Sequence, residues 1–83
     1  MKTIVVAISV DYTNARKVCN RIENEVFETY NDLRNVLNSE LEVEENDVNQ
    51  PQFFTMTDFM EECNDQLFDF EGTFISYVNL KEN

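Results

Sequence analysis

Carboxylates are the most abundant reactive side chains of this chain. It holds 17 Asp and Glu residues against 6 Lys and Arg residues, a formal net charge of −11. A carboxylate pair can hydrolyse a glycosidic bond where a deep cleft holds the sugar and raises the pKa of one acid. A domain of 83 residues rarely builds such a cleft, so we expect solvated acidic surfaces, no catalytic residue and no enzyme activity.

Histidine is absent, which removes Ser-His-Asp and Cys-His catalysis and the commonest metal ligand. The two cysteines, Cys19 and Cys63, fall at apolar positions of helical patterns. Glu61 and Glu62 precede Cys63, and their charges would raise the pKa of its thiol and weaken it as a nucleophile. We expect two reduced, buried thiols; the alternative, one disulfide, requires an oxidising compartment.

The clustered acids also raise the question of a metal site. Four of them share one helical face at positions i, i+3, i+4 and i+7, namely Asp58, Glu61, Glu62 and Asp65. Calcium sites take their ligands from a folded loop, and no D-x-[DN]-x-[DN]-G stretch is present. The segment 44–49 offers at most a weak, adventitious site, so we expect no functional metal and no cofactor.

The negative charge is unevenly distributed along the chain. Residues 1–34 hold five bases and five acids, whereas residues 35–83 hold twelve acids and the single base Lys81, so this second part carries the whole excess of −11. The excess is concentrated in residues 40–47 and 58–65. Such asymmetry is typical of a surface that meets a basic partner, and it argues against direct binding to nucleic acid or anionic membranes.

If residues 40–44 are extended, their three glutamates point the same way at intervals of about 6.6 Å, twice the rise of a strand. That interval is near the spacing of phosphates along one nucleic acid strand, and it predicts a nucleic-acid mimic. The acids expected to bind the partner are Glu40, Glu42, Glu44, Glu45, Asp47, Asp58, Glu61, Glu62 and Asp65. The opposing interpretation is that the acids serve only solubility.

Aromatic residues crowd the same half of the chain. Phe68 and Phe70 alternate with Asp69 and Glu71, a pattern that predicts aromatic anchors inside a charged rim. The alternative is that either ring covers the core.

These features predict a non-enzymatic inhibitor or regulator that binds a basic, nucleic-acid-binding protein in the cytoplasm. In size and acidity the chain resembles small phage- or plasmid-encoded inhibitors of restriction, CRISPR or transcription machinery. The resemblance lies in composition, because no family motif can be matched residue by residue. The alternative function is a self-associating assembly subunit, a homodimer that buries Tyr30, Leu33 and Leu37 between its copies.

Alternating and helical periods predict one α+β domain over residues 1–83. Residues 3–10 and 73–80 are expected to be antiparallel neighbours, with a short third strand near 40–44 or 52–56. Ile4, Val6, Ile8 and Val10 form the fuller face of the first strand, and the other face is expected to be shallowly covered. Helices are expected to cover one face of this sheet.

A helical pattern runs from a Thr13 cap to about residue 38, or to Leu41 if every apolar position is counted. A straight helix of that length, about 43 Å, would overhang a globule whose radius of gyration is about 12 Å. We therefore expect a break among residues 20–24 or 31–35, or an overhang that packs on another copy. A short helix over 58–66, capped by Thr57, should bury the stripe Phe59, Met60, Cys63 and Leu67.

Overall fold

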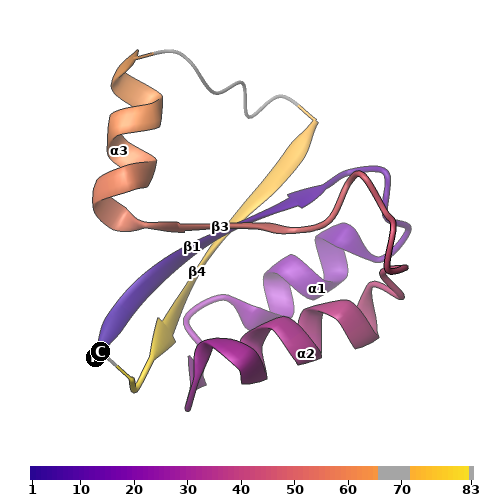
Figure 1. Cartoon of the computed structure of the whole chain (residues 1–83), viewed down its shortest axis with the longest axis horizontal. Coiled ribbons are helices and arrows are strands. Elements are labelled where there is room, and N and C mark those ends of the chain that lie inside the picture. The colour runs from indigo at the N-terminus through magenta and orange to yellow at the C-terminus, as the bar shows by residue number, and fades with distance from the viewer. Residues whose placement is uncertain (66–71, 83) are drawn as a thin grey trace.

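The computed structural model describes residues 1–65 and 72–82, with the backbone alone at 63–65. In chain order these residues form β1 (Lys2–Ser9), α1 (Ala15–Ile22), β2 (Val26–Phe27), α2 (Tyr30–Glu40), β3 (Gln52–Thr55), α3 (Met56–Asp65) and β4 (Thr73–Leu80). The predicted α+β class is confirmed (Figure 1). No helix of the described residues has the length and apolar character that crossing a membrane requires.

The strands form one mixed sheet in the order β2-β4-β1-β3. β1 is antiparallel to both β4 and β3, so the predicted pairing of the first and last strands is confirmed. The third strand lies at residues 52–55, and residues 40–44 are not a strand. β2, which the sequence did not predict, runs parallel to β4. Its two residues are too few to show a period.

The side chains of the central strand β1 are buried on both faces of the sheet. Ile4, Val6 and Ile8 are buried against α1 and α2, as predicted, whereas Val10 lies beyond the strand and is exposed. On the other face Val5 and Ala7 are also buried, so the prediction of shallow cover there is wrong. This face is buried because a helix, α3, packs on it as well.

α3 lies on the opposite side of the sheet from α1 and α2 (Figure 1), so the expectation that the helices share one face is wrong for α3. The Phe59 ring lies 6.3 Å from the rings of both Phe54 and Tyr77. Phe54 and Tyr77 are both cross-strand partners of Val5, which fixes the face that α3 covers. The apolar surface around Val5 explains why the short helix packs there.

The long helical pattern is broken, as expected, and the break begins within the predicted window of residues 20–24. α1 ends at Ile22, and Asn24 takes the left-handed conformation with φ of 65°. The carboxylate of Glu23 accepts hydrogen bonds from the Tyr77 amide and the Ser76 hydroxyl of β4. These bonds hold the chain against β4, and the radius of gyration of 12.3 Å matches that of a compact domain.

The helix caps differ from the predicted ones by one or two residues. α1 begins after Asn14, whose side chain makes no capping bond, instead of Thr13. Thr29 caps α2 by accepting from the Asp32 amide. The Thr55 hydroxyl accepts from the Asp58 amide, so Thr55 replaces Thr57 as the capping residue of α3.

The predicted apolar stripe of α3 is only partly present. Phe59 is half-buried, but Met60 is 57% exposed, which contradicts the prediction for that residue. α3 reaches the sheet through the Phe59 ring, and the neighbouring position faces away from it. The Cys63 side chain and Leu67 lie outside the described residues.

Candidate functional site: two acidic surfaces

The segment that follows α2 is a helix end and not a strand. Glu42 has a φ of 54°, and the Val43 amide donates 3.0 Å to the Asn38 carbonyl in a Schellman motif. Glu40 is the last residue of α2, and its carboxylate pairs with Arg21 of α1. The prediction of three glutamates in a row at phosphate spacing is therefore wrong. Burial of Leu41 in the core favours the helical period over the alternating one.

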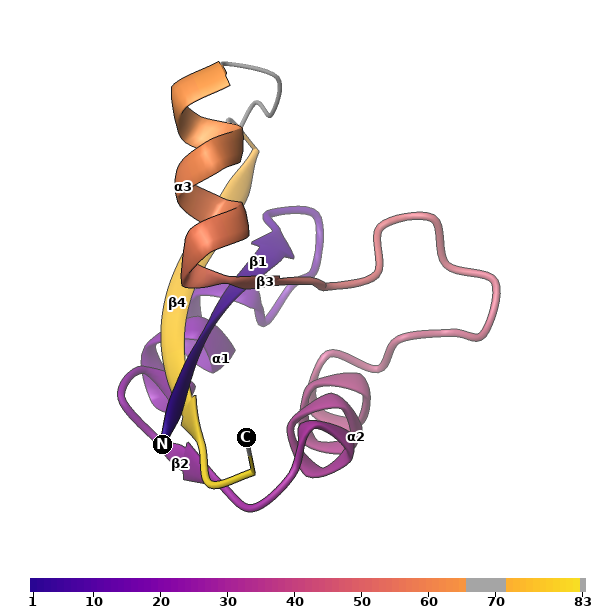
Figure 2. The same cartoon turned by 60° about the vertical axis from the view of Figure 1, so that its left-hand side comes forward.

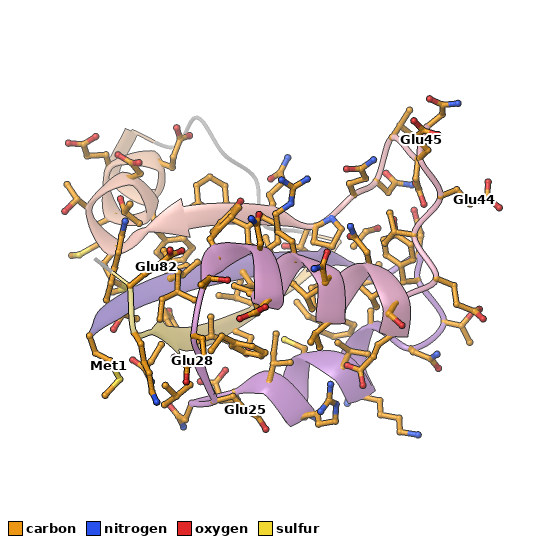
Figure 3. All side chains as sticks on the ribbon, turned by 60° about the horizontal axis from the view of Figure 1, so that its bottom comes forward. Met1, Glu25, Glu28, Glu44, Glu45 and Glu82 are labelled. Carbon is orange, nitrogen blue, oxygen red and sulfur yellow. The ribbon has the colours of Figure 1, made fainter. Side chains whose placement is uncertain are left out.

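Residues 41–51, here named the acidic loop, connect α2 to β3 and extend outward from the sheet (Figure 2). Asp47 anchors the loop, because one carboxylate oxygen accepts from the Tyr12 hydroxyl at 2.7 Å and the other from the Asn49 amide at 2.9 Å. Glu42, Glu44 and Glu45 are exposed. Figure 3 places Glu44 and Glu45 at the outer end of the loop.

The Tyr12–Asp47 contact changes the acidity of both groups. Burial, and then the bond to Asp47 and its charge, raise the pKa of Tyr12 to about 12. The Tyr12 hydroxyl and the Asn49 amide lower the pKa of the Asp47 carboxyl. Asp47 thus stays ionised while it holds the loop in place.

The second acidic surface is the exposed side of α3. Asp58 and Glu61 are exposed, and Glu62 is half-buried. Asp65 is the last residue of α3, and its side chain lies outside the description. Phe68 and Phe70 also lie outside the described residues.

The described carboxylates of these two surfaces have no ion-pair partner among the described side chains. Among the side chains described, no Lys or Arg nitrogen lies within 4.0 Å of a carboxylate of the acidic loop or of α3. Arg21 pairs with Glu40, and Lys81 pairs with Glu28. Arg16 lies over the Phe74 ring and Arg34 over the Tyr30 ring, at 5.3 and 5.8 Å from the ring centroids.

All three views place the acidic loop and α3 at different ends of the molecule (Figures 1–3). The protein therefore presents two separate acidic surfaces, which correspond to the two segments where the sequence concentrates the negative charge, residues 40–47 and 58–65. Among the predicted partner-binding acids whose side chains are described, Glu40 differs from the rest because it already has a cationic partner.

Other candidate chemistry has little support in the described residues. Burial raises the pKa of the Cys19 thiol, which keeps it protonated. No group of three His, Cys, Asp or Glu side chains is placed to hold a metal there. Leu33 and Leu37 are fully buried in the core, so they are not available as a contact between two copies.

Sequence reasoning missed the residues that fix this arrangement. Tyr12 anchors Asp47 across 35 positions of sequence, and Glu23 bonds to β4 across more than 50. Neither contact is marked by a local sequence pattern, so only the tertiary structure could identify the two interactions. Comparison with protein-family models, with curated proteins and with solved structures found no match.

Proposed function

We propose that the protein is a non-enzymatic inhibitor or regulator that binds a basic, nucleic-acid-binding protein through its two acidic surfaces. The observation that carries the proposal is that the acids of the acidic loop and of α3, unlike Glu40 and Glu28, have no cationic partner among the described side chains. Exposed carboxylates of one sign attract a surface of the opposite sign and speed its association.

A nucleic-acid-binding protein is the partner class that suits this charge. Such a protein presents Lys and Arg side chains that neutralise phosphates, and the same side chains can pair with carboxylates. The mimicry that we propose is of charge and not of phosphate spacing, because Glu40, Glu42 and Glu44 do not form a row. Because the composition of the chain resembles that of small phage- or plasmid-encoded inhibitors, the partner that we propose belongs to restriction, CRISPR or transcription machinery.

Matched charge reversals test the proposal. Glu44→Lys with Glu45→Lys changes the acidic loop, and Glu25→Lys with Glu28→Lys makes the same change of charge elsewhere on the surface (Figure 3). The immobilised protein would be incubated with host lysate at about 0.1 M and 1 M salt, where the Debye length falls from about 10 to 3 Å. Captured proteins would be identified by mass spectrometry and tested for release of bound duplex DNA.

We expect capture of a basic nucleic-acid-binding protein at low salt that is lost at high salt and in the loop variant, but kept in the Glu25 and Glu28 variant. The protein should also displace DNA from that partner. The proposal would be contradicted if both variants lost capture of the partner equally, or if capture did not depend on salt concentration. It would also be contradicted if the protein did not displace DNA from the captured partner.

A further inference from the structure

A pocket of about 270 Å³ lies at the end of the sheet where the start of β1 pairs with the end of β4. β1, β3 and β4 each contribute to its wall, together with the first turns of α2 and α3. The side chains that matter below are Tyr30, Phe53, Leu80, Lys2, Asp58 and Glu82. This volume suits one long side chain and is at the small end for a drug-sized ligand.

The inner part of the pocket is apolar and aromatic. Leu80 is 2% exposed, and Phe53 is half-buried on the same face of the sheet. The Tyr30 and Phe53 rings meet edge to face, with centroids 5.1 Å apart and planes at 66°. This contact holds two aromatic walls in a fixed orientation.

The rim carries two carboxylates and one amine. Glu82 accepts a hydrogen bond from the Tyr30 amide, which places its carboxylate at the start of α2. Asp58 is fixed in the first turn of α3, where its amide donates to Thr55 at 3.1 Å. Among the described residues, no Lys or Arg nitrogen, that of Lys2 included, lies within 4.0 Å of either carboxylate. The rim thus keeps an excess of one negative charge.

We propose that this pocket receives an arginine side chain of the basic partner, an inference that rests on the proposed function. A guanidinium group is planar, stacks on aromatic rings and pairs with carboxylates through two parallel bonds. The pocket offers both kinds of contact, with Tyr30 and Phe53 as walls and Asp58 and Glu82 as acceptors. The chain already places guanidinium groups of its own over aromatic rings, at Tyr30 and Phe74.

The charge of Lys2 allows a test that distinguishes a cationic ligand of the pocket from an anionic one. Lys2 is the cross-strand partner of Leu80, so its side chain leaves the sheet on the pocket face. Its positive charge repels an arginine and would attract an anion. Removing that charge must therefore strengthen the binding of a cation and weaken the binding of an anion.

The probe is N-acetyl-arginine amide, compared with N-acetyl-citrulline amide, which has the same shape without the charge. Binding would be followed by ¹H–¹⁵N NMR on the full chain. We expect arginine, but not citrulline, to shift the amide signals of Tyr30, Phe53 and Leu80. Asp58→Asn should weaken binding by about two- to fivefold and Lys2→Gln should strengthen it by a similar factor, the range of one exposed charge pair.

Glu61→Gln is the matched control, because it removes the same charge from the same helix outside the pocket. Equal shifts by citrulline, weaker arginine binding after Lys2→Gln, or equal effects of Asp58→Asn and Glu61→Gln would overturn the arginine pocket. Arginine shifts confined to the acidic loop or to the outer side of α3 would overturn the pocket and leave the proposed function standing. If arginine binds in the pocket but the lysate yields no basic partner whose capture depends on salt, the arginine pocket stands and the proposed function is overturned.

Discussion

Glu42 occupies a backbone position that suits glycine. Its φ of 54° lies in the left-handed region, at the residue that follows the C-cap Leu41 of α2, where most helices with a Schellman motif use glycine. We expect Glu42→Gly to raise the free energy of unfolding by about 0.5–1 kcal/mol, because it removes this strain. Urea unfolding would measure the change. Glu42→Gln removes the charge and keeps the strain, so an equal gain in that variant would attribute the effect to charge.

The Tyr12–Asp47 bond predicts how stability depends on pH at both extremes. Asp47 has a lowered pKa in the folded protein, so its contribution to stability is present above the ordinary pKa of an aspartate, about 3.9, and is lost as the pH falls through the lower folded value. Tyr12 has a raised pKa of about 12, so its contribution is present below about pH 10 and is lost as the pH rises toward 12.

Tyr12→Phe removes the hydroxyl that makes this bond. We expect this variant to lose part of the pH dependence of urea unfolding in both windows, and the pKa of Asp47, followed by ¹³C NMR, to rise toward its ordinary value. A variant with an unchanged Asp47 titration would show that the hydroxyl does not hold the acidic loop.

At the scale of the elements, the turn between α1 and β2 is held by Glu23. Its carboxylate accepts hydrogen bonds from β4, as the backbone of a neighbouring strand would. It accepts from the Tyr77 amide at 3.0 Å and from the buried Ser76 hydroxyl. We expect Glu23→Ala to destabilise the fold by about 1–2 kcal/mol, because the Tyr77 amide loses its acceptor. Glu23→Gln keeps an acceptor oxygen, so we expect it to destabilise the fold less than Glu23→Ala does.

Hydrogen exchange gives the specific readout for this element. Exchange of the Tyr77 amide should accelerate in Glu23→Ala far more than that of Val5, which lies in the neighbouring strand. Glu25→Ala is the control, because it removes a carboxylate from the same turn, whereas the side-chain bonds to β4 described above are made by Glu23. Uniform acceleration along β4 and β1 would indicate general destabilisation and would contradict a local role for Glu23.

The elements that the sequence predicted are those whose pattern is local. β1 and β4 are runs of eight residues rich in β-branched or aromatic side chains, and the α2 pattern ends where Leu41 reaches the core. β2 was missed because its two residues are a strand only through their bonds to the remote β4. For the candidate site the sequence identified the acids and their concentration in two segments, but not how the acidic loop is held, because the Tyr12–Asp47 contact joins distant segments.

At the scale of the whole molecule, eleven excess negative charges lie within principal extents of 31 × 29 × 23 Å. At an ionic strength of 0.01 M the Debye length is about 30 Å, so the acidic loop and α3 repel each other across the molecule. At 0.15 M it is about 8 Å, and repulsion acts only within each surface. Folding brings these charges together, so low salt must destabilise the folded state.

Salt should therefore change folding and partner binding in opposite directions. We expect the melting temperature to rise between 0.01 and 0.15 M NaCl, while capture of the basic partner weakens as salt increases further. Glu44→Gln with Glu45→Gln should raise the melting temperature at 0.01 M, with a smaller gain at 0.15 M, because these two acids are exposed and contribute to the repulsion. A melting temperature that falls over this range would show that attractive ion pairs, such as Arg21–Glu40 and Lys81–Glu28, outweigh the repulsion between the acidic surfaces.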